Sequence, residues 1–371
     1  MNVLFLAPPD RRPYELSYFC SFPPNCVTIA VDRNTYERYL DWFDEFSNFD
    51  VVFLPKKRGI LSSFFHSTAS DTIYDKKQLE KVITDKNIDI IVTVELFSFL
   101  SKEASVLCRQ FSLSHAVIVW ENIKNHPLYH LPPFKLNVDF VLRGVKKIIA
   151  VTNKSQISLF ALNVPAEKVK VIYPGVLLDN FNYRRLKKDF SLLFVGGLEK
   201  HKGFHLLLQA FQKLCSKYDC LTLAVVGDGK LKEKLLRMKI KLGERRITYF
   251  GEVPHSKINL IYPRAEIFCF PSLKQKFWGL LPIREEQYGF SLVEAMASRL
   301  PIIASKLESI QEIAGPHNLY SLNVKELVNN LDNLLENENL RKEISLLNRR
   351  RVENLFDARK QSKVFRKFVM M

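Results

Sequence analysis

Two glutamates in the second half of the chain, Glu286 and Glu294, flank a glycine-containing turn of seven residues. An apolar stretch before them, Ile267–Phe270, predicts a buried strand, and Ser291–Ser298 predicts a helix that contains the second glutamate. Free backbone amides and the positive end of the dipole at a helix start attract phosphate. Carboxylates accept hydrogen bonds from sugar hydroxyls. The segment therefore predicts a site for both ends of a sugar diphosphate.

A simpler interpretation explains the same residues without a ligand. Ser291 followed by Glu294 fits the Ser-x-x-Glu pattern of a capping box. Glu286, next to Glu285, could be one more solvated charge. The pair alone does not decide between the two interpretations.

The sequence around the glutamates resembles the retaining glycosyltransferases of family four, of the glycosyl transferases group 1 type. Their donor motif, Glu-x7-Glu followed by Ala-Met-Ala, is matched by residues 286–297. The resemblance extends from about residue 148 to residue 315. The other family landmarks occur in the family's order: Val171–Val176, Leu193–Leu198, Lys202-Gly203, Val225–Gly229, Tyr249–Pro254 and Phe270–Ser272.

The resemblance implies an α/β protein of the GT-B fold. In this fold two doubly wound Rossmann-like domains face each other across a cleft, and the C-terminal helix crosses back to the first domain. The length of 371 residues also predicts two domains. The expected division is an acceptor-side domain (1–180), a polar linker (181–190), a nucleotide-sugar domain (191–356) and a crossover helix (357–371).

The pattern of apolar runs supports this architecture independently. Strands alternate with amphipathic stretches, and their continuous Val, Ile and Leu content is typical of parallel strands covered on both faces. The expected strands of the first half are Val3–Leu6, Val27–Val31, Val51–Leu54, Ile88–Val94, Ala116–Trp120 and Lys147–Val151. Those of the second half are Leu192–Val195, Leu221–Val226, Ile247–Phe250, Ile267–Phe270, Ile302–Ala304 and Leu319–Ser321.

The family's site residues can be transferred to matching positions. The resemblance implies that Glu286 anchors the hydroxyls of the transferred sugar, that Glu294 holds the ribose, and that Lys202 reaches the diphosphate as a point charge. Glu286 is therefore expected to be catalytic. The remaining donor-binding positions implied by the resemblance are Gly196, Gly197, Gly227, Asp228, Pro271, Ser272, Gly289, Phe290, Ser291 and Leu292.

Two departures from the family pattern favour an alternative function. Gly197 stands where the family usually has an Arg that donates to phosphate, and Arg299 stands where it usually has Gly. These residues leave open a nucleotide-sugar-binding protein with weakened or lost turnover. A GT-B glycan phosphorylase is a further alternative, although no pyridoxal-phosphate lysine motif is recognisable.

No cofactor or metal is expected. Gly227-Asp228-Gly229 lacks the third glycine of a dinucleotide fingerprint, so a redox cofactor is poorly supported. The chain contains no Asp-x-Asp, and its eight histidines show no metal-ligand spacing. The sequence therefore predicts a metal-independent enzyme in which amides and Lys202 balance the charge of the diphosphate.

In the first half, Glu121 is the second catalytic candidate. It follows a predicted strand at the rim where ligands of doubly wound sheets bind. Many family members have His at this position, so Glu121 could orient or deprotonate an acceptor hydroxyl. Alternatively, Glu121 caps the following segment. Glu95, at the rim of the neighbouring strand, is a further candidate of the same kind.

The charge of +16 predicts attraction to anionic partners, although general solubility also explains it. Lys56–Phe65 joins basic residues to aromatic ones, as a membrane-surface segment would, and a buried helix after a basic loop explains it as well. The expected partners are a nucleotide sugar, a sugar or lipid-linked acceptor and an anionic membrane surface, but not nucleic acid.

The sequence predicts a cytoplasmic protein, peripheral on the membrane at most. It has six cysteines without a Cys-x-x-Cys pair, no membrane-spanning apolar run and no signal peptide.

Overall fold

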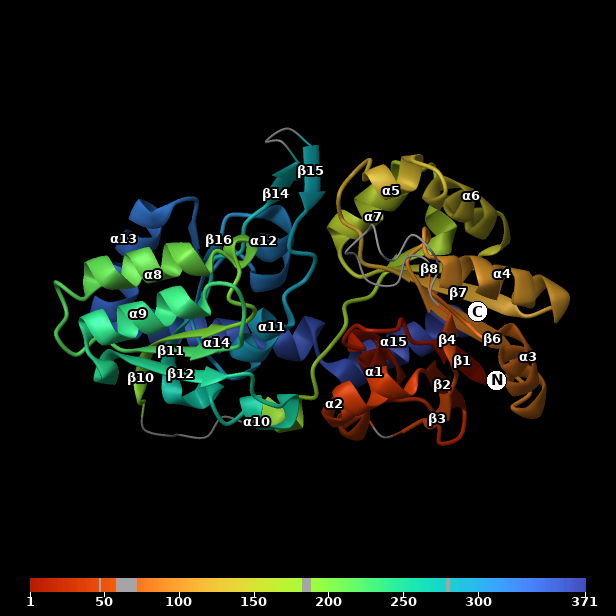
Figure 1. Ribbon diagram of the computed structural model, residues 1–371, viewed down its shortest axis with the longest axis horizontal. Coiled ribbons are helices and arrows are strands. Elements are labelled where there is room, and N and C mark those ends of the chain that lie inside the picture. The colour runs from red at the N-terminus through yellow and green to blue at the C-terminus, as the bar shows by residue number, and fades with distance from the viewer. Residues whose placement is uncertain (47, 58–71, 182–187, 278–280) are drawn as a thin grey trace. The chain divides into compact units, whose positions relative to one another are not determined.

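The computed structural model describes residues 1–46, 48–57, 72–181, 188–277 and 281–371. The chain forms two compact units, shown in Figure 1: Met1–Gly175 together with Ala358–Met371, and Val176–Asp357. Both units are α/β and are built on parallel sheets, as the sequence predicts.

The first unit contains a seven-stranded parallel sheet in the order β3-β2-β1-β6-β7-β8-β9. The strands β1, β2 and β6 are buried along their whole length, which explains their uninterrupted apolar sequences. A separate antiparallel pair joins β4 (Lys56–Lys57) to β5 (Ile73–Tyr74). The strands of the large sheet are β1 (Val3–Leu6), β2 (Val27–Val31), β3 (Asp50–Phe53), β6 (Ile90–Val94), β7 (Ser114–Val119), β8 (Lys147–Ala150) and β9 (Val169–Val171).

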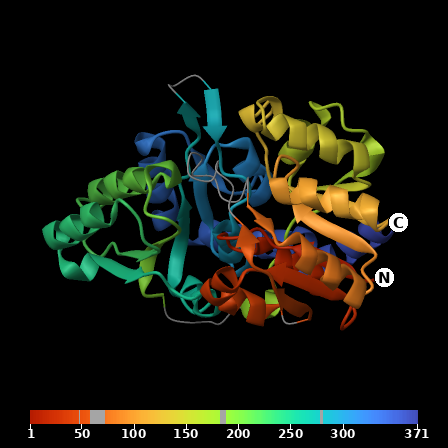
Figure 2. The same cartoon turned by 45° about the vertical axis from the view of Figure 1, so that its right-hand side comes forward.

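Helices cover both faces of this sheet (Figures 1 and 2). Leu4 and Leu6 pack in one core with α3 and α4, whereas Phe5, between them, lies 5.2 Å from the ring of Phe19. The helical segments are η1 (Tyr14–Phe19), α1 (Arg33–Arg38), α2 (Leu40–Glu45), α3 (Lys76–Asp85), α4 (Phe99–Gln110), α5 (Pro127–His130), α6 (Phe134–Gly144), α7 (Asn153–Phe160), η3 (Ala166–Lys168) and α15 (Ala358–Met370).

The C-terminal helix α15 belongs to the first unit, as expected for a helix that crosses back. The ring of Phe365 stacks on Tyr18 of η1 at 4.9 Å. The hydroxyl of Ser362 donates to the carbonyl of Tyr18 at 2.7 Å. These contacts join the two ends of the chain in one core.

The strand order of the first unit creates a switch point between β1 and β6. From β1 the chain continues to β2 and β3 on one side of the sheet, and later strands are added from β6 on the other side. Connections that leave in opposite directions open a crevice at the carboxyl ends of the two central strands, where doubly wound folds bind ligands.

The second unit repeats this plan with a six-stranded parallel sheet in the order β12-β11-β10-β13-β16-β17. Here the switch point lies between β10 and β13. The strands are β10 (Phe190–Val195), β11 (Leu223–Val226), β12 (Ile247–Gly251), β13 (Ala265–Phe270), β16 (Ile302–Ser305) and β17 (Leu319–Ser321). The helical segments are η4 (Leu178–Phe181), η5 (Lys200–Lys202), α8 (Phe204–Leu214), α9 (Lys232–Leu242), η6 (Glu244–Arg246), α10 (His255–Ile258), η7 (Tyr262–Arg264), α11 (Phe290–Ala297), α12 (Glu308–Ala314), α13 (Val324–Glu336) and α14 (Glu338–Leu355).

An antiparallel hairpin, for which the apolar pattern gives no signal, follows β13. It pairs β14 (Gln275–Phe277) with β15 (Leu281–Arg284). The turn that includes Trp278 lies outside the described residues.

The predicted membrane segment, Lys56–Phe65, is described only at its first two residues. Lys56 lies 2.7 Å from a carboxylate oxygen of Asp10 and 3.1 Å from one of Asp32, and its side chain is 14% exposed. Lys56 is therefore bound within the first unit. Among the described residues, no helix is long and apolar enough to cross a membrane.

Candidate active site

The side chain of Glu286 lies in a polar cluster beside the end of β13. The Lys202 ammonium donates to Glu286 Oε2 at 2.6 Å and the Ser272 hydroxyl to the same atom at 2.9 Å. The carboxylate is 13% exposed. Burial opposes its ionisation, but the Lys202 charge and the hydrogen bonds from Lys202 and Ser272 outweigh burial and hold the Glu286 pKa below its ordinary value. Glu286 is therefore an ionised acceptor at neutral pH.

Lys202 reaches this cluster because Gly203 follows it. Gly203 has φ +66°, and a Cβ at this position would lie 1.7 Å from the carbonyl oxygen of Pro271. Only glycine lets η5 lie against the end of β13 in this way. The amide of Leu273 donates to the carbonyl of His201 at 2.7 Å and joins the same two segments.

The adjacent glutamate is not a solvated charge either. The Glu285 side chain is 1% exposed and lies 3.1 Å from Lys274 Nζ. The Ser309 hydroxyl donates to Glu285 at 3.2 Å and to the carbonyl of Glu286 at 2.6 Å. Both carboxylates are thus held in place, and the surface-charge interpretation of Glu286 is wrong.

The second motif glutamate, Glu294, lies in the second turn of α11. It is 3% exposed. His255 Nε2 lies 2.8 Å from Glu294 Oε1, and the Tyr262 hydroxyl donates to Oε2 at 2.7 Å. The helix begins after Gly289, which has φ +85° and makes no side-chain cap. Ser291 is therefore inside the helix, and the capping box with Glu294 does not form.

His255 and Tyr262 are contacts that the sequence patterns did not identify. They lie 39 and 32 residues before their partner Glu294. A signal for His255 was present, because it directly follows the Tyr249–Pro254 landmark. Tyr262 had no such signal, since its hydroxyl is paired only through the tertiary fold.

Two glycine-rich turns meet at the ends of β10 and β11. The amide of Gly196 donates to the carbonyl of Val226 at 3.0 Å, and the amide of Leu198 donates to the carbonyl of Asp228 at 2.9 Å. The Asp228 carboxylate accepts a hydrogen bond from the amide of Gly229, in the same turn, at 2.6 Å. Its other oxygen lies 3.0 Å from Lys232 Nζ. These predicted donor-site residues therefore share one rim of the sheet, with Asp228 occupied in shaping the turn.

The predicted phosphate-binding amides begin α11. Within this group the Leu292 amide donates to the carbonyl of Gly289 at 3.0 Å, so it is used inside the first turn. The structure thus brings Lys202, Ser272 and Glu286 into direct contact, and Pro271 lies against Gly203. It encloses Glu294 between two other side chains.

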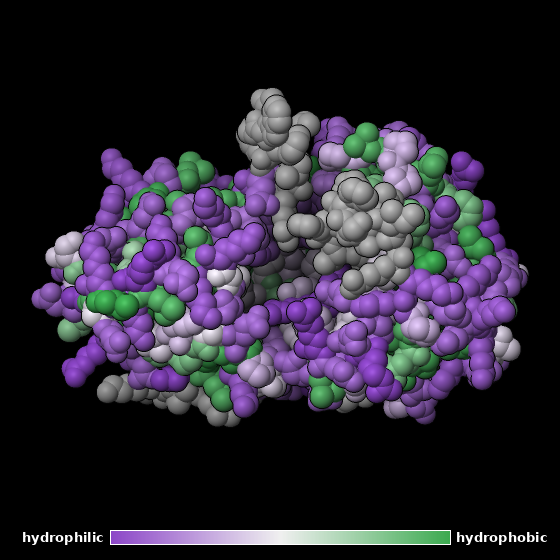
Figure 3. Space-filling view, in the orientation of Figure 1, coloured by the Kyte–Doolittle hydropathy of each residue, from purple (hydrophilic) through white to green (hydrophobic). Residues whose placement is uncertain are grey.

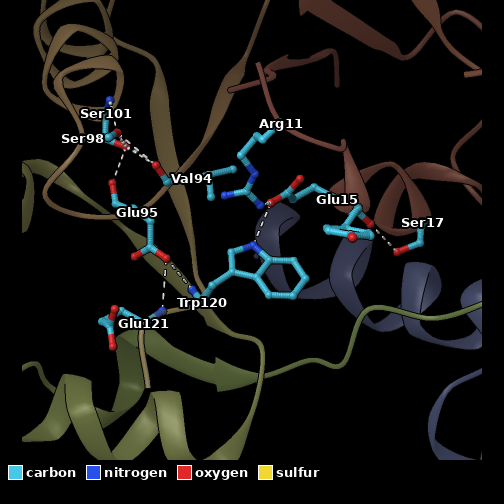
Figure 4. Close-up of polar contacts among 10 residues, drawn as sticks. Arg11, Glu15, Ser17, Val94, Glu95, Ser98, Ser101, Trp120 and Glu121 are labelled. Atoms are coloured by element: carbon cyan, nitrogen blue, oxygen red, sulfur yellow. Dashed lines mark hydrogen bonds and ion pairs between the residues drawn. The ribbon is translucent and has the colours of Figure 1, made fainter. Parts of the chain in front are cut away.

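In the first unit, Glu121 follows β7 and is 6% exposed. Its Oε1 accepts the amide of Ile123 at 2.7 Å, which is the capping role considered above, and its Oε2 lies 3.9 Å from His126 Nε2. The amides of Trp120 and Glu121 both donate to Oε1 of Glu95, as Figure 4 shows, at 3.0 and 3.1 Å. Glu95, beside the switch point, and Glu121, after the next strand of the sheet, are thus neighbours.

Within the part of the chain that the structure describes, no group of three or more His, Cys, Asp or Glu residues could hold a metal ion. Lys202, 2.6 Å from Glu286, is a cation that can meet a negative charge at this site.

Comparison with known proteins matches residues 178–351 to the family model described as glycosyl transferases group 1. An uncharacterised glycosyltransferase of Methanocaldococcus jannaschii is 27% identical over 166 residues, which are 41% of this chain and 40% of that protein. The gpi3 subunit of phosphatidylinositol N-acetylglucosaminyltransferase of Schizosaccharomyces pombe is 24% identical over 248 residues, or 64% of this chain and 50% of that protein. The chain thus spans half or less of the length of these two relatives.

Solved structures show the same fold along the whole chain. HepE of Anabaena in complex with UDP superimposes with a TM-score of 0.76 at 16% identity and covers 100% of both chains. This likeness supports the two Rossmann-like halves of the GT-B fold.

Proposed function

We propose that the protein is a retaining glycosyltransferase, because residues 178–351 match the glycosyl transferases group 1 model and the chain has the GT-B fold. It moves a sugar, of hexosyl type, from a nucleotide-diphosphate sugar to a hydroxyl acceptor. The observation that carries the proposal is the contact of Lys202 and Ser272 with Glu286 at the carboxyl edge of the second sheet.

Each group in this contact has a chemical role in the proposal. Glu286 is ionised, so it accepts hydrogen bonds from the hydroxyls of the donor sugar. Lys202 forms an ion pair with Glu286 in the absence of donor. When the donor binds, Lys202 moves to contact the diphosphate, and Glu286 then accepts hydrogen bonds from the sugar. Glu294, held by His255 and Tyr262, supports the ribose end.

The departing diphosphate needs positive charge as its bond to the sugar breaks. In our proposal Lys202 and the amides at the start of α11 supply this charge in place of a metal ion. Retention follows if the acceptor oxygen attacks from the face that the phosphate leaves. The C1–O bond to phosphate then breaks as the new C1–O bond forms, and the acceptor proton passes to a phosphate oxygen.

The acceptor site belongs to the first unit in this proposal. Glu121 lies at the carboxyl edge of the sheet, one strand from the switch point, and can receive a hydrogen bond from the acceptor hydroxyl. The Schizosaccharomyces pombe relative is named for a phosphatidylinositol substrate. We extend the proposal to a sugar or lipid-linked acceptor, with the protein working at the surface of an anionic membrane.

A nucleotide-sugar-binding protein without turnover is the second candidate, and Gly197 favours it. The family's arginine at this position would donate two hydrogen bonds to phosphate, and glycine donates none from its side chain. This candidate predicts binding of the donor without release of free nucleotide.

The test is incubation of the purified protein with a panel of nucleotide-diphosphate sugars, followed by quantification of released nucleoside diphosphate. We expect release from one donor, in excess chelator as well as without it. Glu286→Gln should lower the rate about ten-fold or more, because a charge-assisted hydrogen bond contributes roughly 1.5–3 kcal/mol. The exposed Glu233→Gln in α9 is the matched control and should leave the rate unchanged.

Three results would contradict parts of the proposal. Binding without release from any donor identifies the binding protein. Inhibition by chelator that Mg²⁺ or Mn²⁺ reverses contradicts the metal-free phosphate site. Release that depends on inorganic phosphate and a glycan identifies a phosphorylase.

A further inference from the structure

Near the carboxyl edge of its sheet the first unit buries Asp32, which Lys56 compensates, and three glutamates. Glu15 in η1 is 0% exposed, Glu95 after β6 is 8% exposed and Glu121 after β7 is 6% exposed. Figure 4 shows Glu95 and Glu121 on the same side of Trp120, and Glu15 on the other side with Arg11. Burying a carboxylate is costly unless its charge is compensated or removed, so each of the three requires an explanation.

The negative charge of Glu15 is compensated by a neighbouring arginine and an indole N–H. Arg11 Nη2 lies 2.5 Å from Glu15 Oε1, and the indole N–H of Trp120 donates to the same oxygen at 2.7 Å. The Arg11 charge is thereby used on Glu15, in contact with the ring of Trp120. Arg11 also favours the ionised form of Glu95, but by less than burial and the charge of Glu121 oppose it.

Glu95 is held in a strained and specific geometry. Its backbone has φ +65°, unusual for a residue other than glycine. Its amide donates to the carbonyl of Ile118 at 2.8 Å, and its carbonyl accepts the hydroxyl of Ser101 at 2.7 Å. Its Oε1 accepts the amides of Trp120 and Glu121. One side chain therefore joins the ends of β6 and β7.

The other carboxyl oxygen of Glu95 is different. Oε2 is buried and has no hydrogen-bond partner. The charged and titratable groups that face Glu95 are Glu121 beyond β7, Arg11 after β1, and Tyr129 in α5. Burial, and after it the charge of Glu121, raises the pKa of Glu95 to about 8. Burial, and then the charges of Glu95 and Glu121, raises the pKa of the Tyr129 hydroxyl well above 10.0, so Tyr129 remains neutral.

We propose that Glu95 is a positioning residue for the acceptor side, a neutral carboxyl that fixes the Trp120-Glu121 backbone and thereby sets where the Glu121 side chain meets the acceptor hydroxyl. The proposal rests on the role proposed above for Glu121. The amides of Trp120 and Glu121 favour an ionised Glu95, but burial and the charge of Glu121 outweigh them, so the neutral carboxyl accepts both amides through its carbonyl oxygen. Transfer to the acceptor therefore fails when Glu95 loses its proton.

The test compares wild type with Glu95→Gln, since glutamine keeps the accepting oxygen and cannot ionise. We expect wild-type transfer to the acceptor to fall about ten-fold per pH unit above the Glu95 pKa. The Glu95→Gln variant should transfer sugar at near the wild-type rate at pH 7. Its rate should stay constant to at least one pH unit above the pH at which the wild-type rate begins to fall. An alkaline decline unchanged by the substitution would overturn the proposal.

A stability measurement tests the same claim without any catalysis. The folded pKa of Glu95 lies above its ordinary value of 4.5, so the protonated side chain favours the folded state. This contribution is complete below about pH 4.5 and is lost as the pH rises to about 8. The unfolding temperature of Glu95→Gln should therefore exceed that of wild type by a margin that grows between these pH values.

The exposed Glu167→Gln in the same unit is the matched control and should follow wild type. Parallel pH curves for wild type and Glu95→Gln, or a Gln variant that does not fold at pH 7, would overturn the proposal. If no acceptor is ever glycosylated, the proposed function fails. The unfolding curves still decide whether Glu95 is protonated in the folded protein.

Discussion

At the scale of single residues, the candidate donor site consists of pairs that are distant in sequence. Lys202 meets Glu286 across 84 residues, and His255 meets Glu294 across 39. The motif glutamates and Lys202 were predictable from local patterns because each lies in a short stretch with its own signature. Their partners were not, since no local pattern says which side chain occupies a carboxylate's lone pairs.

Gly197 gives a prediction at this scale. A Cβ at this position would meet its nearest atoms, in Glu199 and Asp228, at 3.8 and 3.9 Å, which are ordinary contacts. Gly197→Arg should therefore fold and add a bidentate donor beside the diphosphate. We expect the Kd for nucleoside diphosphate to fall about ten-fold, measured by calorimetry, with no change for the free nucleoside. Unchanged diphosphate affinity in a folded variant would show that residue 197 does not face the phosphate.

At the scale of elements, the strands of both large sheets were predictable from their continuous apolar sequences. The edge strand Val169–Val171 was not, because its burial is incomplete and Lys170 interrupts it. The hairpin of β14 and β15 was also missed. It is stabilised by pairing between two short segments and not by a long apolar run.

The end of α11 gives a prediction at the element scale. The amide of Leu300 donates to the carbonyl of Ala295, and that of Arg299 to Met296, both at 3.0 Å, the bonding of a Schellman motif. The motif places Arg299 at φ +60°, in the left-handed region. This explains why the resembling family uses glycine there, and it removes Arg299 as a reason to expect lost activity.

Arg299→Gly should relieve this strain and stabilise the protein by roughly 1 kcal/mol. Chemical denaturation measures the effect, and the rate of nucleotide release should not change. Arg299→Ala, which keeps the left-handed strain, is the control. Equal destabilisation by both substitutions would mean that the arginine side chain contributes more than the backbone strain costs.

At the scale of the whole molecule, the charge of +16 is the dominant property. The face of the protein in Figure 3 is mostly hydrophilic over both units, with scattered apolar residues. Lys56 does not contribute to a free basic surface, since two carboxylates hold it. Any attraction to an anionic membrane therefore has to come from other cations.

The proposed membrane association predicts binding to vesicles that contain anionic lipid and none to neutral vesicles. Each basic residue near an anionic surface contributes about 1 kcal/mol, and salt screens this attraction. Co-sedimentation should thus decrease as ionic strength rises. Phe64→Ser with Phe65→Ser tests whether these aromatics, which lie outside the described residues, add to binding. Equal binding to neutral and anionic vesicles would leave only a soluble acceptor.

In the proposed function, the second unit binds the diphosphate of a nucleotide sugar through Lys202. The most direct test is calorimetric titration of wild type and Lys202→Met with a nucleoside diphosphate and with the same nucleoside lacking phosphate. We predict that the substitution weakens diphosphate binding about ten-fold or more and leaves nucleoside binding unchanged. Diphosphate affinity that is the same in both proteins would contradict the account.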